Sequence, residues 1–317
     1  MSDSDVPKWF LDLAGRNTGM RSFTESGLRD RFGEPSEINL ERGQLWRAGW
    51  ADVAVLLVLL ELGDGEVRAS PVTIDPPAED ENGFVLAPTC TGLPTSATVW
   101  TGFTRFFPQR VLDTLVAAWS ADLTTCLANP ASLDPGSRLP VGMRRGRPID
   151  SEFDHRSMIR AGLEDDVDQL GQMPGLPVES PGSSSTTLAA VLGDVDLAAL
   201  CAALKLPQPA VMKLLRGTAP LTPAQAAVIA QTTGISQERV LGAVRSMPRG
   251  LVQAADHPRW RQVWITRARR LGTDETQARL DGCQQAFALA ARQTGGSEPD
   301  WDARLQRALF GEGGELR

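Results

Sequence analysis

The stretch LAALCAALKLPQPAVMKLLRG, residues 197–217, decides the fold of the C-terminal half of this chain. Its first apolar residues recur at the spacing of one face of an α-helix: Leu197, Leu200, Cys201 and Leu204. After a short turn, a second helix is marked by Val211, Leu214 and Leu215. Pro209 suits the first turn of that second helix, where no backbone donor is needed. We therefore expect two short helices joined by a tight turn.

Further short helices flank this pair. Residues Ala224–Thr232 predict one helix, which Gly234 ends, and Ser236 is a candidate N-cap for the next, ending near Val244. A weakly marked first helix is expected around Thr187–Gly193.

Five short helices with short connections resemble the DNA-binding domain of the lambda-repressor/Cro-like (XRE) helix-turn-helix family, over about 60 of the 317 residues. In this resemblance LAALCAALKLP is the second helix with its turn, and QPAVMKLLRG is the third. The third helix of such domains enters the major groove of DNA. The resemblance implies double-stranded DNA as a partner, commonly bound by a homodimer.

The candidate DNA-binding side chains on the third helix are Gln208, Lys213 and Arg216. Gln can pair with adenine, and Lys or Arg can pair with guanine or with phosphate. Because the rest of this helix is apolar, a helix-turn-helix that binds only protein stays open as an alternative. A second group of cations lies further along the chain: Arg259, Arg261, Arg267, Arg269 and Arg270. These arginines would either neutralise phosphates or complement the negative end of their own helix.

The region after residue 247 is predicted to be helical as well. Apolar residues at helical spacing mark one helix: Trp260, Val263, Trp264, Ala268 and Leu271. A further helix is expected with Thr273 as its cap and with Leu280, Cys283, Phe287 and Ala291 on its buried face. Asp300–Phe310 predicts the last helix.

The N-terminal half is predicted to form β structure. GQLWRAGW (43–50), the apolar run 53–62, EVRASPVTI (66–74), FVLAP and ATVWTGF predict short strands separated by Gly and Pro turns, an arrangement typical of a small barrel. A helix is expected from Pro108 over PQRVLDTLVAAW, and another over Ser26–Phe32.

Residues 40–115 resemble the MazF/PemK-type toxin barrel, which is SH3-like. GQLW matches its opening strand, and SPVT (70–73) matches its Thr-bearing strand. The resemblance implies Arg47 and Thr73 as the pair for metal-independent RNA cleavage. However, the basic loop that supplies the family's arginine is missing, since only RAGWAD separates Trp46 from Val53. We therefore favour a non-catalytic barrel and keep an endoribonuclease as the alternative.

Charge and composition divide the chain near residue 186. Residues 1–186 hold 27 acidic and 16 basic residues, whereas 187–317 hold 12 and 16. MPGLPVESPGSSSTT (173–187) has the composition of a flexible linker, and the acidic stretch Asp150–Leu170 is interpreted as a solvated segment, with a weak helix as the alternative. The predicted divisions are a barrel domain with flanking helices (1–150), an acidic segment and linker (151–186), a helix-turn-helix domain (187–247) and a helical region (248–317).

The sequence lacks the motifs of several functional classes. The four cysteines are far apart and only two histidines occur, so we expect free thiols and no metal site. The sequence holds no GxxxxGK[ST], GxGxxG, HExxH or GxSxG, and we expect no cofactor. Without a long apolar run or a signal-like N-terminus, a cytoplasmic protein that makes no membrane contact is expected.

These patterns together predict a multidomain protein with an N-terminal, mainly-β SH3-like barrel and a C-terminal all-α helix-turn-helix bundle. The function they favour is a DNA-binding transcriptional regulator, which the resemblances connect to a toxin–antitoxin or phage-defence locus. In this hypothesis the acidic barrel binds a protein partner or dimerises, and the chain is not an enzyme. The alternatives are a MazF-like ribonuclease with a targeting module and a protein-interaction scaffold.

Overall fold

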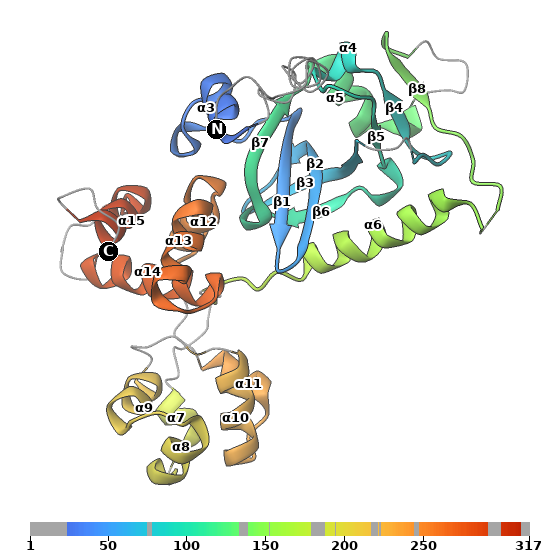
Figure 1. Ribbon diagram of the computed structural model, residues 1–317. Coiled ribbons are helices and arrows are strands. Elements are labelled where there is room, and N and C mark those ends of the chain that lie inside the picture. Colours follow the sequence, from blue (N-terminus) through green and yellow to red (C-terminus); the bar gives the residue numbers. More distant parts are fainter. Residues whose placement is uncertain are drawn as a thin grey trace, which may run out of the picture. The chain divides into compact units, whose positions relative to one another are not determined.

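The computed structural model describes residues 24–74, 78–132, 139–151, 153–178, 188–193, 195–216, 221, 223–243, 247–290 and 299–311. The chain divides into two compact units. The first, here called the β unit, runs to Met173 and includes His257–Arg261; the second, the helical unit, holds Pro174–Asp256 and the residues from Gln262 onward. The prediction of a β-sheet part followed by a helical part is confirmed (Figure 1).

The β unit is built on one antiparallel sheet, which has eight strands among the described residues. Its order is β7-β1-β2-β3-β5-β4-β8, and β6 also pairs with β3. The strands are β1 (Gln44–Trp50), β2 (Val53–Leu62), β3 (Glu66–Thr73), β4 (Phe84–Leu86), β5 (Ala97–Val99), β6 (Arg105–Pro108), β7 (Leu112–Ala118) and β8 (Met143–Arg145).

Five of these strands curl around a common core. In the series β7-β1-β2-β3-β6, the two outermost strands are joined by only one short 3₁₀ turn, η3 (Gln109–Val111). A linker of that length spans at most about 14 Å between its flanking Cα atoms. A flat sheet would separate its first and fifth strands by about 19 Å. The sheet must therefore bend so that its ends approach one another.

Both faces of the sheet are apolar. Trp46, Leu57, Val67, Phe107 and Leu112 are buried in one cluster on the inner side of the curl. The alternate residues Leu45, Val58 and Val72 belong to a second cluster, together with α5 (Ala121–Ala128) and the strands β4 and β5. The remaining short elements of this unit are α3 (Glu25–Phe32), α4 (Pro88–Thr91), η1 (Pro35–Glu37), η2 (Thr101–Phe103), η4 (Pro130–Ser132) and η5 (Pro258–Trp260).

The helix expected from Pro108 is wrong. Residues 109–111 form η3, and the following residues form β7, which pairs with β1 through two irregularities in register. VLDTLVAA fits helical and strand spacing about equally, and hydrogen bonds to the edge of β1 decide between them, because tertiary pairing overrides local preference. The helix expected over Ser26–Phe32 is confirmed as α3.

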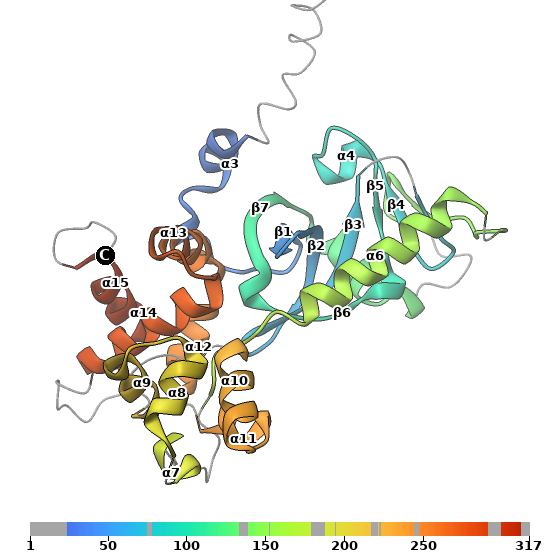
Figure 2. The ribbon, with the colours of Figure 1, turned by 60° about the horizontal axis from the view of Figure 1, so that its bottom comes forward.

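The acidic segment is a helix rather than a solvated stretch, so the preferred interpretation of it was wrong. Helix α6 (His155–Gly171) begins at Asp154, whose carboxylate accepts a hydrogen bond from the Arg156 backbone N–H. Leu163, Val167 and Leu170 form a buried stripe in the core of the β unit, while Glu164, Asp165 and Asp168 are exposed on the outer side. Figures 1 and 2 show α6 running along the sheet, where it contacts β1, β2 and β6. The prediction of a flexible linker is wrong for its first residues, because Met173 and Leu176 are buried and Val178 forms a β-bridge with Met247. The rest of the predicted linker, 179–187, lies outside the described part.

The helical unit contains two groups of helices. The first is α7 (Leu188–Leu192), α8 (Leu197–Leu204), α9 (Gln208–Leu215), α10 (Pro223–Thr233) and α11 (Gln237–Gly242), which share one apolar core. The chain enters and leaves this group side by side, because Val178 and Met247 form a parallel β-bridge and the Met247 N–H donates to the Pro177 carbonyl at 2.8 Å. Close entry and exit points are typical of a separable domain.

The second group is α12 (Arg249–Asp256), α13 (Arg261–Leu271), α14 (Glu275–Ala290) and α15 (Trp301–Phe310). Helices α13 to α15 were predicted, whereas α12 was not. The expected Thr273 cap is wrong by one residue, since the Asp274 carboxylate accepts from the Gln277 N–H at 2.7 Å. Among the described residues no single helix is long and apolar enough to cross a membrane; α8 and α9 taken together meet the length and composition criteria, but they are sharply bent.

Candidate nucleic-acid interface and the β2–α6 cavity

Helices α8 and α9 meet at 104° across a break of three residues, 205–207. Leu200 on α8 and Val211 and Leu214 on α9 are buried at their junction, in the core of the first helix group. Helix-turn-helix pairs cross at about 90–120° over connections of three to four residues. The geometry of α8 and α9 therefore falls within the range of that motif.

The turn between the two helices has a specific structure. The Lys205 N–H donates to the Ala202 carbonyl and the Leu206 N–H to the Cys201 carbonyl, at 3.3 and 3.2 Å. This double pattern is the Schellman motif, which satisfies the free carbonyls at a helix end. Lys205 has a left-handed backbone conformation with φ 54°, at the position where glycine is most common.

The three residues expected to contact DNA share the outer side of α9. Gln208, Lys213 and Arg216 are all exposed, whereas Val211 and Leu214 on the same helix are buried. Lys205 in the turn and Arg239 on α11 add two more exposed cations to this helix group. The outer side of α9 therefore carries hydrogen-bonding and cationic groups above an apolar base.

The arginines around α13 are divided between buried and exposed positions. Arg261 is 5% exposed and donates to the backbone carbonyls of Gly49, at 2.7 Å, and Arg110. Arg267 is 3% exposed and pairs with Asp281 at 2.6 Å.

Arg259 is half-buried, and its Nε lies 3.1 Å from Nδ1 of His257. Arg269 and Arg270 are exposed in the last turn of α13. Because Arg261 and Arg267 are committed to internal partners, we remove both from the expected DNA surface.

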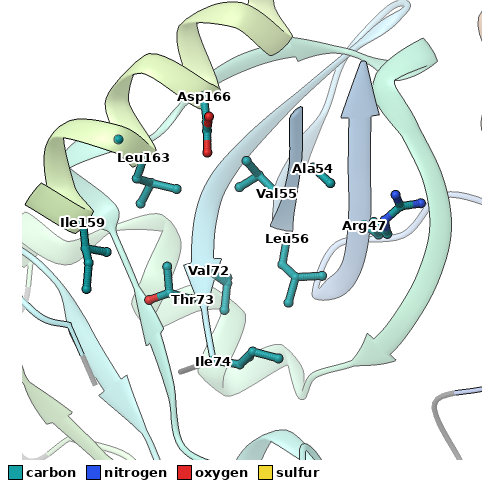
Figure 3. Close-up of a pocket in the computed structure, with 11 residues that line it drawn as sticks. Arg47, Ala54, Val55, Leu56, Val72, Thr73, Ile74, Ile159, Leu163 and Asp166 are labelled. Carbon is teal, nitrogen blue, oxygen red and sulfur yellow. The ribbon is translucent and has the colours of Figure 1, made fainter. Parts of the chain in front are cut away.

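A cavity of about 570 Å³ opens in the β unit beside α6, and we call it the β2–α6 cavity (Figure 3). Arg47 and Thr73, the pair implied by the toxin resemblance, both line it. Both side chains have hydrogen-bond partners. Arg47 donates to the Asp113 carboxylate at 2.8 Å, and the Thr73 hydroxyl accepts from the Trp100 indole N–H at 3.0 Å.

Two carboxyl groups of this region have raised pKa values. Burial raises the pKa of Asp113, although its neighbours Thr114, Arg47 and Arg261 act in the opposite direction. Partial burial raises the pKa of Asp166, and the nearby carboxylates of Asp165 and Asp52 raise it further. Asp166 projects from α6 into the cavity, on the side away from Arg47 (Figure 3).

Asp113, Asp166 and the cavity were not expected from the sequence. Asp113 lies in the segment predicted as a helix, and Asp166 lies in the stretch interpreted as solvated. One signal for Asp166 was present in the sequence. Leu163, Val167 and Leu170 have the spacing of a helix with one buried face, and Asp166 lies at the edge of that face.

Within the described ranges, no group of three or more His, Cys, Asp or Glu side chains is arranged to hold a metal ion. Cys283 is fully buried, and Cys90, Cys126 and Cys201 are partly buried; all four are free thiols. No protein-family model matches this sequence, and a search of curated proteins finds no similar one.

Proposed function

We propose that this chain is a DNA-binding transcriptional regulator in which α8 and α9 form a helix-turn-helix. The observation that carries the proposal is the 104° crossing of the two helices over a three-residue turn. In such motifs the second helix of the pair lies in the major groove and the first crosses the DNA backbone. In this chain those roles fall to α9 and α8.

The side chains on the outer side of α9 support this assignment. An exposed Gln208 near the start of the helix has the two-point donor and acceptor pattern that reads adenine, and Lys213 and Arg216 suit guanine or phosphate. Exposed Lys205, in the turn that precedes α9, adds a cation for the phosphate backbone.

The β unit supplies a contact surface rather than a catalytic one in this proposal. Its curled five-strand core is compatible with a small SH3-like barrel, and its sequence is strongly acidic, which disfavours RNA. Arg47 is already paired with a buried carboxylate. We assign to this unit a protein partner or a second copy of the chain. The link to a toxin–antitoxin or phage-defence locus rests on the two resemblances alone.

Binding of the full-length chain to DNA tests the proposal. The preferred sequence is selected from a randomised duplex library, and its affinity is measured by fluorescence anisotropy at several salt concentrations. We expect the double variant Lys213→Ala/Arg216→Ala to bind more weakly and to lose roughly 2 units of salt slope, about 1 for each phosphate contact. If the two residues read bases instead, the selected sequence loses its advantage over other duplexes.

The matched control is Arg29→Ala/Arg31→Ala, which removes the same charge from exposed positions on α3 in the β unit. This control should leave both affinity and salt slope unchanged. No selected sequence, or equal behaviour of the two double variants, would contradict the assignment of α9 and would favour the protein-interaction scaffold.

A further inference from the structure

The β2–α6 cavity has the size and walls of a small-molecule site. Its volume of about 570 Å³ lies within the usual range of about 300–1,000 Å³ for ligand pockets. Most of its lining is aliphatic, from Val55, Leu56 and Val72 on the strands and from Ile159 and Leu163 on α6. Such walls favour a ligand with an apolar body, because burying apolar surface stabilises the complex.

The cavity has one charged group that is neutralised by a neighbour and one for which no such neighbour is found in the described part of the chain. On one side, the guanidinium of Arg47 is neutralised by Asp113, whose side chain is only 5% exposed. On the other side, no hydrogen bond or ion pair is found for the Asp166 carboxylate within the residues that the structure describes. The carboxylates of Asp165 and Asp52 act on Asp166 from the same helix and from the turn between β1 and β2, and burial and these two neighbours together raise the pKa of Asp166.

We propose that the β2–α6 cavity binds an organic cation with an apolar body, a hydrophobic amine whose ammonium group pairs with Asp166. The aliphatic walls take the body of the ligand, and the carboxylate of Asp166, with those of Asp165 and Asp52 close behind it, attracts its charge. An anion would have to compete with Asp113 for Arg47 and would face Asp166 across the cavity, so it fits less well. This site lies wholly in the β unit and does not depend on the function proposed for α9.

Three probes of one shape and different charge test this proposal on the full-length chain. They are 4-phenylbutylamine, 4-phenylbutanol and 4-phenylbutyrate, each titrated at pH 7 by isothermal calorimetry. We expect the amine to bind about tenfold more tightly than the alcohol. The reason is that a charge-assisted hydrogen bond to Asp166, in a partly desolvated site, is stronger than the neutral bond that the alcohol can form. The carboxylate should bind most weakly.

Two variants locate the site. Asp166→Asn keeps the shape of the side chain and removes its charge, so the amine should lose about tenfold in affinity while the alcohol is unaffected. Gly162→Leu narrows the cavity and should weaken both; a Cβ at Gly162 meets no atom within 4 Å, so the helix accommodates it. Glu164→Gln is the matched control, because Glu164 is an exposed carboxylate on α6 that does not line the cavity.

The outcomes are decisive in both directions. A preference for the amine that disappears in Asp166→Asn and persists in Glu164→Gln supports the site. A preference for 4-phenylbutyrate would overturn the charge assignment and point to Arg47. Equal binding of all three probes, no measurable binding at millimolar concentration, or an unchanged Asp166→Asn would overturn the proposal itself.

Discussion

Gly282 lies where α14 packs against the indole ring of Trp264, which is fully buried and donates to the Ala255 carbonyl at 2.9 Å. A Cβ at Gly282 would stand 2.6 and 2.8 Å from two ring carbons of Trp264. Overpacking a well-filled core costs about 1–3 kcal/mol. We expect Gly282→Ala to destabilise α14 by that amount, although alanine favours helix formation.

Hydrogen exchange, followed by mass spectrometry on peptides from α13 and α14, measures this change. Gly162→Ala in α6 is the control, because its Cβ meets no atom within 4 Å and alanine should stabilise a helix there by up to about 1 kcal/mol. Faster exchange in α14 with slower exchange in α6 is the expected pair of results. Stabilisation by both variants would show that the Trp264 contact is loose.

The residue scale is also where prediction from the sequence was weakest. Arg261 and Arg267 were expected at a DNA surface because they belong to a cluster of arginines along residues 259–270 that could neutralise phosphates. Their burial depends on partners that no local pattern reveals, since Gly49, Arg110 and Asp281 are brought close only by the fold. Gln208, Lys213 and Arg216 were placed correctly on the exposed side because the spacing of Val211 and Leu214 fixes which side of α9 is buried.

At the scale of elements, the turn between α8 and α9 holds one residue, Lys205, in a strained backbone conformation. Lys205 takes a left-handed backbone at φ 54°, which costs a residue with a Cβ roughly 1–2 kcal/mol. Glycine relieves that cost but loses more entropy on folding. We expect Lys205→Gly to stabilise the end of α8 by about 1 kcal/mol, while keeping both hydrogen bonds of the Schellman motif.

About 1 kcal/mol corresponds to roughly fivefold slower hydrogen exchange in peptides that cover residues 197–216. Lys205→Ala removes the same charge without relieving the backbone, so it separates the two effects. Equal exchange rates in the glycine and alanine variants would contradict the strain argument.

Helices with one clear apolar stripe were predictable, and ambiguous segments were not. The stripes in residues 197–215 and 260–271 gave α8, α9 and α13 nearly to the residue. β7 was missed because its sequence fits two spacings, and its strand form depends on the edge of β1. A small barrel was expected from the series of short strands, but the strand order was not. The curl depends on η3, which joins the two end strands of the series β7-β1-β2-β3-β6, and that order is decided by strand pairing.

At the scale of the whole molecule, the chain returns once to the β unit after α12. Residues His257–Arg261 belong to that unit, although they lie more than 80 residues beyond Met173. Arg261 fixes this return through its bonds to the backbone carbonyls of Gly49, at the end of β1, and Arg110, in η3. Asp113 lies near enough for its charge to interact with that of Arg261.

We expect Arg261→Ala to destabilise the β unit by about 3 kcal/mol, because a buried carbonyl and a partly buried one lose their donor and Asp113 loses a nearby opposite charge. Hydrogen exchange in peptides from β1 and β7 should become at least tenfold faster, whereas peptides from α8 to α10 should be unaffected. DNA affinity at fixed salt should not change at temperatures where the β unit stays folded.

Arg269→Ala is the matched control, since Arg269 is an exposed arginine on the same helix, α13. It should leave exchange in β1 and β7 unchanged. If Arg261→Ala instead left the β unit intact and weakened DNA binding with a smaller salt slope, Arg261 would contact phosphate in solution, and the return of the chain to the β unit would not be held by this side chain.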